Sequence, residues 1–305
     1  MRLTLNSLHF DPPFSESFER DGVYGYLVGV SAKDSISGRE IVGSSFSEYE
    51  DDAKKKAYGE LAERVCALRS SPRQHVNPHA VSALSNGWAA HPNLSQAKAS
   101  AFLELSERHR ILHSWYSGLP PMRLEKPTLP SSLAAIGNRI ELYRFPSPQG
   151  PEVCMTIIHP TGVSGPECSI IGFGASYSLD IAGARASNEA LQRWAFLYDE
   201  TPDKNWYNLS ASALFQQEFG LSTEGQGLLL KWLSGDLERL ALRNQPYLTE
   251  TEAAFHLSSI EMLGEELQIC QCTHPSSLPL IFGPQPKALL PWIPNHEPRW
   301  IHPIA

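Results

Sequence analysis

Two short segments of the sequence carry the same pattern of acidic and basic residues. Residues 60–64 read Glu-Leu-Ala-Glu-Arg, and residues 104–108 read Glu-Leu-Ser-Glu-Arg. Positions three and four apart share one face of a helix, so each segment would present two carboxylates and a guanidinium together. A solvated, salt-bridged surface is the ordinary interpretation of one such segment, because exposed pairs at this spacing are common and weak. Its repetition in one chain favours a common chemical role.

A third segment carries a related set of residues. Arg185 and Glu189 are four positions apart and Gln192 follows Glu189 by three, so all three can share one helical face. Small residues, among them Ala97 and Ala101, precede the second acidic segment. They would let that helix approach other backbone closely, as a buried helix does. We therefore expect the three helices to converge.

Converging carboxylates and guanidiniums point to a nucleotide site. A cluster of carboxylates is repulsive unless cations neutralise it. Mg²⁺ binds a few carboxylates together with phosphate oxygens, and the arginine fork binds phosphate with two hydrogen bonds. Acids and arginines together therefore fit a magnesium-bound nucleotide better than either set alone.

These segments, in this order, resemble the YcaO family. That family has a helix of the form S-x-x-x-E-x-x-E-R, then Ser-Asn-Gly followed by another E-x-x-E-R helix, then a helix with R-x-x-x-E-x-x-Q. The matching residues here are Glu60, Glu63 and Arg64; Ser85-Asn86-Gly87 with Ser100, Glu104, Glu107 and Arg108; and Arg185, Glu189 and Gln192. The resemblance runs from Val23 to Arg193, and the second motif is the most specific.

The resemblance implies a site that binds ATP and Mg²⁺. The residues it assigns to the nucleotide are Glu60, Glu63, Arg64, Ser100, Glu104, Glu107, Arg108, Arg185, Glu189 and Gln192. The residues it assigns to Mg²⁺ are Glu60, Glu63, Glu104, Glu107 and Glu189. It assigns no residue a direct role in proton transfer or nucleophilic attack.

The same resemblance implies an enzyme that activates backbone amides of a ribosomally made peptide. In the family a nucleophile adds to an amide carbonyl, ATP phosphorylates the resulting oxyanion, and the oxygen leaves as phosphate. The product is an azoline, a thioamide or an amidine, depending on the nucleophile. Two alternatives remain open: a protein that supports thiolation of a ribosomal protein, and a non-catalytic scaffold that binds a partner. Retention of all five motif glutamates argues against the scaffold.

The sequence departs from the family pattern in three places. Lys56 stands where the first motif would have serine, and it could bind a phosphate or remain solvated. The entry before the first helix, Gly43-Ser-Ser-Phe46, is poorer in glycine than usual. Residues 298–305 are rich in proline but lack the P-x-P-x-P ending frequent in azoline-forming members. We expect residues 300–305 to lie near the active site or a partner surface.

The resemblance also implies partners. A precursor peptide would be the substrate, and homodimerisation is compatible with the family. The sequence begins almost directly with the catalytic region, so we expect a separate leader-binding protein, or an E1-like or TfuA-like partner.

The elements that would position these residues are helices and strands without strict βαβ alternation. We predict helices over residues 47–68, 95–115, 181–198, 210–219 and 225–243. We predict strands over residues 22–30, 38–42, 138–145, 152–159, 167–173 and 266–273, the first two forming a hairpin. The sequence has neither the Rossmann nor the P-loop glycine motif. The fold class is therefore α+β, with mixed sheets packed against long helices.

We expect a single catalytic domain over residues 1–305, with a motif core over 23–198 and a helical, proline-rich part over 199–305. The net charge is −8, with 25 Lys and Arg against 33 Asp and Glu, which argues against nucleic-acid binding. The apolar runs are too short to span a bilayer, and no signal peptide is present. Five cysteines without a disulfide-like spacing favour a cytoplasmic protein with no membrane association.

Two further groups of residues allow two interpretations each. Cys270, Cys272 and His274 could ligate a metal, but in a strand both cysteines would face one side as small core residues. The histidines His75 and His79 fall in a loop-rich stretch, where solvated or capping roles are more common than catalytic ones. The same holds for His91.

Overall fold

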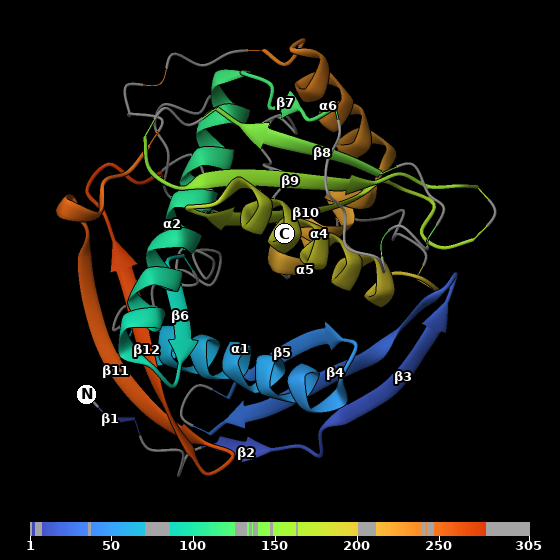
Figure 1. The fold of residues 1–305 in the computed structure, drawn as a ribbon. Coiled ribbons are helices and arrows are strands. Elements are labelled where there is room, and N and C mark those ends of the chain that lie inside the picture. The colour runs from blue at the N-terminus through green and yellow to red at the C-terminus, as the bar shows by residue number, and fades with distance from the viewer. Residues whose placement is uncertain are drawn as a thin grey trace.

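A computed structural model describes most of the chain. The described residues are 2–3, 8–35, 38–70, 86–125, 133, 136, 140–146, 149–162, 164–200, 212–238, 242 and 247–278. They form three sheets, against which the helices pack (Figure 1). This is the predicted α+β class with mixed sheets, and it is neither a Rossmann nor a P-loop fold. No helix in the described part of the chain is long and apolar enough to cross a membrane.

The first sheet comes from the N-terminal part of the chain. Its strands are β2 (Leu8–Phe10), β3 (Phe14–Arg20), β4 (Val23–Asp34) and β5 (Glu40–Ser47). The long strand β4 pairs antiparallel with each of the other three. The predicted hairpin is confirmed, with Val30 opposite Gly43. Strands β2 and β3 were not predicted, because β3 is mostly exposed and lacks a buried stripe.

The second sheet joins segments from both halves of the chain. Its strands are β1 (Arg2–Leu3), β6 (Trp88–His91), β11 (Ala254–Met262) and β12 (Glu265–Thr273), in the order β1, β11, β12, β6. The predicted strand over 266–273 is confirmed as β12. Cys270 and Cys272 are fully buried in it, as core residues. Among the described residues, no three His, Cys, Asp or Glu side chains form a metal-binding cluster.

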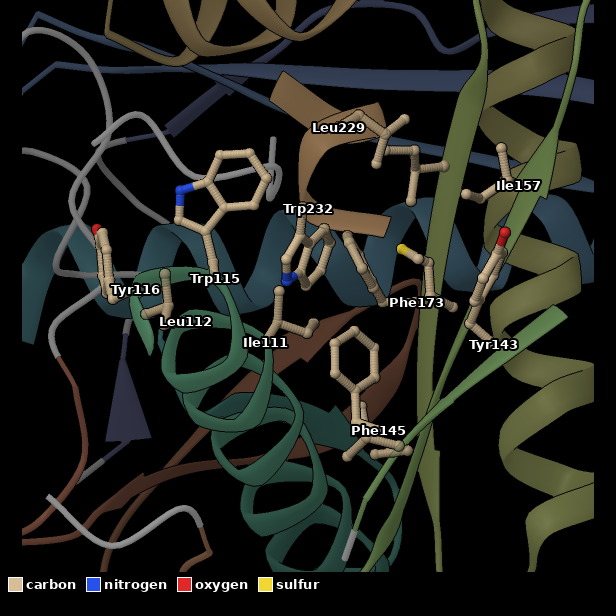
Figure 2. Close-up of a cluster of buried hydrophobic side chains, with 14 of the residues drawn as sticks. Ile111, Leu112, Trp115, Tyr116, Tyr143, Phe145, Ile157, Phe173, Leu229 and Trp232 are labelled. Atoms are coloured by element: carbon tan, nitrogen blue, oxygen red, sulfur yellow. The ribbon is translucent and has the colours of Figure 1, made fainter. Parts of the chain in front are cut away.

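The third sheet carries the largest apolar core. Its strands are β7 (Met122–Arg123), β8 (Ile140–Phe145), β9 (Glu152–Ile158) and β10 (Ile170–Ser176), in the order β10, β9, β8, β7. Figure 2 shows the side chains packed between this sheet and two helices. At its centre Trp115 and Trp232 meet edge to face, with ring centroids 5.1 Å apart. Aromatic pairs of this geometry stabilise the folded protein by more than the burial of their apolar surface alone would.

The helices agree with the sequence prediction except at some ends. They are α1 (Glu50–Ser70), α2 (Leu94–Ser117), α4 (Leu179–Phe196), α5 (Ser212–Leu221), α6 (Thr223–Ser234) and the short η3 (Glu250–Glu252). Asn93 caps α2, accepting hydrogen bonds from the backbone of Ser95 and Gln96. The prediction that a helix continues to residue 243 is wrong. Gly235 adopts the left-handed conformation, with φ 79°, and ends α6 one residue after Ser234.

Candidate active site

Three strand edges face the helices that carry the acidic segments. Within the described residues, β5 pairs only with β4, β6 only with β12, and β10 only with β9. Each strand therefore has one edge without a β-partner. The next helix along the chain packs against each of them: α1 on β5, α2 on β6 and α4 on β10. We call these three pairs the strand–helix units.

A glutamate from each helix satisfies a backbone N–H on the open edge of its own strand. The donor and the acceptor are 16 residues apart in all three units. The pairs are Ser44 with Glu60 at 2.6 Å, Trp88 with Glu104 at 2.6 Å, and Phe173 with Glu189 at 3.1 Å, each from backbone N to Oε2. Charge-assisted bonds of this kind hold a carboxylate in one orientation.

A glycine directly before each donor lets the chain approach closely. A Cβ atom on Gly43 would lie 2.2 Å from the backbone O of Ala57 in α1. One on Gly172 would lie 2.1 Å from the backbone N of Ala190 in α4. Gly87 has φ +75°, and a Cβ there would lie 2.3 Å from the backbone O of Cys272. Any larger residue would push the helix or the neighbouring strand away.

The glutamate three residues further along can reach the next unit. Glu63 of α1 accepts a hydrogen bond of 2.6 Å from the backbone N of Ala90 in β6. Helix α2 likewise contacts β10, and α4 contacts β5. The three units therefore contact one another in a closed ring, β5–α1 to β6–α2 to β10–α4 and back. The acidic segments lie near the middle of α1 and α2.

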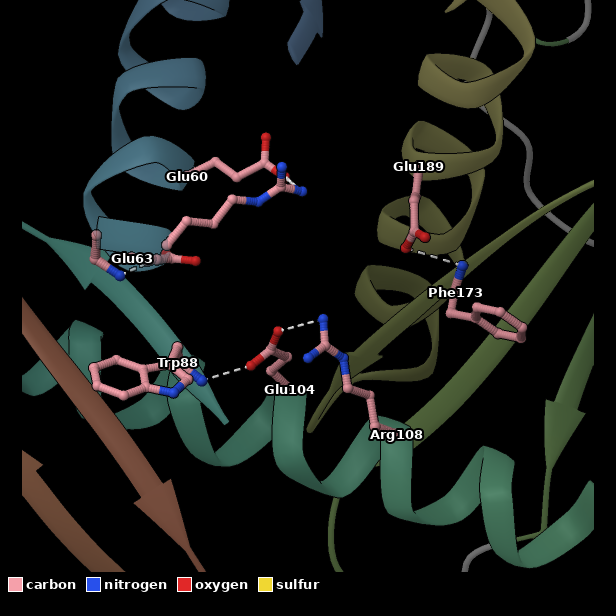
Figure 3. A network of polar contacts seen from close by, with 9 residues as sticks. Glu60, Glu63, Trp88, Glu104, Arg108, Phe173 and Glu189 are labelled. Carbon is pink, nitrogen blue, oxygen red and sulfur yellow. Dashed lines mark hydrogen bonds and ion pairs between the residues drawn. The ribbon is translucent and has the colours of Figure 1, made fainter. Parts of the chain in front are cut away.

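Figure 3 shows the side chains of this ring pointing toward a common space. Glu60 and Glu63 extend from α1, Glu104 and Arg108 from α2, and Glu189 from α4. In two units the arginine four residues after the first glutamate pairs with it. The Nη2–Oε1 distances are 2.6 Å for Arg64 with Glu60 and 2.7 Å for Arg108 with Glu104. The predicted convergence of the three helices is thus found in the structure.

Burial and mutual repulsion disfavour the charged forms of these carboxyl groups. Burial raises the pKa of Glu63 well above its usual range, and the nearby carboxylate of Glu104 raises it further. Burial and then Glu189 raise the pKa of Glu107 in the same way. Burial also raises the pKa of Glu104 and of Glu189, although Arg108 and Arg193 respectively oppose the effect. A bound cation would relieve this repulsion.

Several carboxylate oxygens remain available to a cation. Glu107 accepts no hydrogen bond from any described residue, and Glu63 accepts only the one from Ala90. The ring holds no preformed group of three acidic ligands in its described part. That suits Mg²⁺, which is usually held by one or two carboxylates while substrate phosphates and waters complete its coordination. The residues present therefore fit a magnesium-bound phosphate compound.

The remaining predicted site residues lie around this ring. Ser100 is half-buried in α2, one turn before Glu104. Arg185 is exposed, and its Nη1 donates a 2.8 Å hydrogen bond to the backbone O of Ala175. Gln192 is half-buried in α4. Lys56 is exposed on α1. Ser85 and residues 298–305 lie outside the described residues, as do His75 and His79.

Sequence reasoning missed some of this architecture. It did not recognise that a glycine before each donor lets helix and strand approach, or that strand N–H groups orient the glutamates, and it left Arg193 out of the site. Arg193 occupies the position in α4 that Arg64 and Arg108 occupy in α1 and α2. The recurring 16-residue spacing was the available signal. That spacing can be interpreted only when the open edges of the three strands are known.

Comparison with known proteins agrees with this architecture. A family model described as YcaO cyclodehydratase, ATP- and Mg²⁺-binding, matches residues 65–278. No curated protein matched the sequence. The structure of YcaO from Methanopyrus kandleri bound with AMPPCP and Mg²⁺ is similar, with a TM-score of 0.53 at 15% identity over 87% of this chain and 85% of that one.

Two solved complexes from E. coli are similar to the same extent. The microcin synthetase McbBCD complex gives a TM-score of 0.56 at 12% identity, covering 90% of each chain. The same complex with pro-MccB17 bound gives 0.55 at 12% identity, also over 90% of each chain. At these identities the likeness establishes a common fold and nothing about substrates.

Proposed function

The chain belongs to the YcaO family, which binds ATP and Mg²⁺, and from that premise we propose that it uses both to phosphorylate a backbone amide oxygen of a ribosomally made peptide. One observation carries the proposal: the ring of strand–helix units gathers Glu60, Glu63, Glu104 and Glu189 with arginines around a common space, and Glu107 lies near Glu189. Such a set is repulsive alone and matches a cation with an anionic ligand.

In this proposal the glutamates divide into those held by the protein and those with free oxygens. Glu60 and Glu104 each use one oxygen for a strand N–H and the other for an arginine. Glu60 and Glu104 therefore hold the strands, helices and arginines of the ring in place. Glu63, Glu107 and Glu189 keep oxygens that can bind Mg²⁺. All five belong to the proposed metal and nucleotide set.

The arginines and the remaining polar residues complete the proposed nucleotide site. Arg64 and Arg108 are each held by the glutamate four residues before them, and Arg64 also donates to the backbone O of Val42. In this proposal their positive charge stabilises the phosphates. We include Ser100, Arg185 and Gln192 in the same set. When bound, magnesium-ATP supplies the phosphoryl group that turns a poor leaving group, the amide oxygen, into phosphate. The protein's part is to position that group and to stabilise the charge that develops on it.

The proposed substrate is a precursor peptide, delivered with the help of a separate partner protein. The E. coli synthetase was solved as a complex of different proteins, and also with pro-MccB17 bound. Those complexes support the kind of partner and substrate. The product is an azoline, a thioamide or an amidine, according to whether the nucleophile is a substrate side chain, a sulfur donor or an amine.

Thermal unfolding with magnesium-ATP tests the nucleotide site. A ligand that binds only the folded state stabilises it by about 2.7 kcal/mol at a hundred times its dissociation constant. We expect a clear rise in Tm with millimolar magnesium-ATP, and loss of that rise with EDTA. Tm should rise much less with Mg²⁺ and adenosine in place of ATP, because adenosine has no phosphate. No response at millimolar magnesium-ATP would contradict the proposal.

The amide step needs a separate measurement. With a peptide labelled with ¹⁸O at the modified carbonyl, the label should appear in the phosphate released from ATP. ATP hydrolysis without label transfer would contradict amide phosphorylation while leaving nucleotide binding intact. Binding with no turnover in the presence of peptide and partner would instead favour the non-catalytic scaffold.

A further inference from the structure

The third strand–helix unit differs from the other two in its polar residues. Three residues after its first glutamate it carries Gln192, where α1 and α2 carry Glu63 and Glu107. One residue later all three helices carry an arginine. Glu63, at the corresponding position of α1, bonds β6 of the next unit, and α4 contacts β5 of the first unit. On this pattern we place the neutral glutamine where the third unit meets the first. That part of the ring therefore has one carboxylate fewer than the other two junctions.

The side chain of Arg193, the arginine of this unit, has no hydrogen-bond or ion-pair partner in the described part of the chain. Arg64 and Arg108 are ion-paired with the glutamate four residues before them. The side chain of Arg193 makes no hydrogen bond or ion pair with any described residue, and its Nη1 atom is buried. The corresponding glutamate, Glu189, bonds the backbone N of Phe173.

An unpaired guanidinium in this position is costly to the folded protein. Burial lowers the pKa of Arg193, and Glu189 only partly opposes that effect. Arg193 is half-buried, and a buried N–H group such as its Nη1 is destabilising without a hydrogen-bond partner unless a ligand satisfies it. The ordinary interpretation is a cation that merely balances Glu189. That interpretation leaves unexplained why the other two arginines bond their glutamates directly.

We infer that Arg193 is an anion-binding residue that contacts a phosphate group of the bound nucleotide, at the junction where Gln192 replaces a glutamate. The inference rests on the proposed function and adds a residue to it. The guanidinium fork suits phosphate oxygens, to which it can donate two hydrogen bonds. The neutral side chain of Gln192 does not repel an anion there, whereas a glutamate would.

The test compares Arg193→Gln with the wild-type protein across ligands of decreasing charge. Affinities for ATP, ADP, AMP and adenosine are measured with Mg²⁺ by calorimetry, or by ligand-observed NMR for the weakest. We expect the variant to bind ATP roughly 10- to 100-fold more weakly, as for loss of a charged hydrogen bond. Its affinity for adenosine should be within about twofold of wild type, because adenosine has no phosphate. Inorganic tripolyphosphate with Mg²⁺ should raise the Tm of wild type more than that of the variant.

Two further variants separate anion binding from a structural role. Arg193→Lys keeps the charge but not the fork, so its ATP affinity should fall between wild type and Arg193→Gln. Arg144→Gln is the control, because Arg144 makes two bonds with Glu152 on β9 and lies outside the ring. It should bind every ligand as wild type does. If Arg193→Gln does not fold, the lysine variant alone decides.

Each outcome has a definite meaning. Equal losses for ATP and adenosine would make Arg193 a structural residue and overturn the inference. Unchanged ATP affinity in Arg193→Gln, or wild-type affinity in the lysine variant together with an unfolded glutamine variant, would overturn it too. If wild-type protein binds no nucleotide, the proposed function itself fails. A loss confined to the phosphorylated ligands supports the inference.

Discussion

Replacing Glu107 with glutamine removes one negative charge from the ring, at a carboxylate that the described residues leave without a hydrogen bond. Glu107 accepts no hydrogen bond from the described residues, and burial together with Glu189 raises its pKa well above the usual range. Glutamine is nearly the same size, so packing should be preserved. The exchange therefore separates two roles. If Glu107 is a metal ligand, its loss should not lower the stability of the ligand-free protein. If it is a structural carboxylate, its loss should lower that stability.

The sign of the stability change follows from proton linkage. Above the unfolded-state pKa, the unfolded chain releases a proton that folded Glu107 retains, so the free energy of unfolding falls as the pH rises toward the raised folded-state pKa. Each unit of such a shift corresponds to about 1.4 kcal/mol. The variant cannot ionise and escapes this loss. We expect it to be more stable than wild type by about 1 kcal/mol or more at pH 8, and equally stable near pH 4.

Urea unfolding at pH 4, 6 and 8 without ligand measures the stability difference, and the urea dependence should stay unchanged. With magnesium-ATP the order should reverse, because the variant gains less from the ligand. ATP-dependent turnover should fall by roughly two orders of magnitude, as when a preorganised electrostatic contact to the transition state is lost. The matched variant Glu104→Gln should lose turnover similarly. It should gain less stability, because it also weakens the pairing with Arg108.

Two results would refute this reasoning. A variant less stable than wild type at pH 8 would mean that Glu107 makes a favourable contact in the apo protein. Full ATP-dependent turnover in the variant would remove Glu107 from the metal and nucleotide set, whatever its effect on stability.

Two other predictions concern the frame of the site and the end of the chain. Gly172→Ala should lower the free energy of unfolding by about 1–3 kcal/mol or more and weaken magnesium-ATP binding, because the new Cβ would lie 2.1 Å from the backbone N of Ala190 and displace α4. The control Gly59→Ala has open space around the new Cβ and should gain about 0.5–1 kcal/mol in urea unfolding; a similar loss in both variants would contradict the packing argument. Deleting residues 300–305 should reduce turnover in the presence of partner and leave the urea midpoint unchanged, since a proline-rich segment loses little entropy on docking. Unchanged turnover would make these residues a simple terminus.

The local pattern of the sequence was sufficient to predict the helices and the face of each that carries the acidic residues. Helical periodicity is set by residues three and four apart, so α1, α2 and α4 and their acidic faces could be predicted without any partner. The hairpin of β4 and β5 is local as well, since a short turn joins its strands. The order of the motifs along the sequence was sufficient to identify the family.

Strands whose partners are distant in sequence could not be predicted. Strand β6 has four residues, two of them alanine, and no local turn pairs it. Its partner is β12, where Gln268 lies opposite His91. Strand β11 is mostly exposed or half-buried and shows no clean alternation. Such segments become strands because the edge of a neighbouring strand satisfies their backbone hydrogen bonds. The strand propensity of the local sequence contains no information about that neighbour.

The sequence by itself determined that carboxylates and arginines recur at helical spacing, and hence the class of ligand they suit. Only the tertiary structure decided how each is used. It supplies the open edges of β5, β6 and β10, which fix three glutamates by their backbone N–H groups. It pairs Arg64 and Arg108 with glutamates, whereas no described residue pairs with the side chain of Arg193. Identical residue types at identical spacing differ in role because the local sequence sets the direction of a side chain, whereas burial and the neighbouring chain set its charge state and its partner.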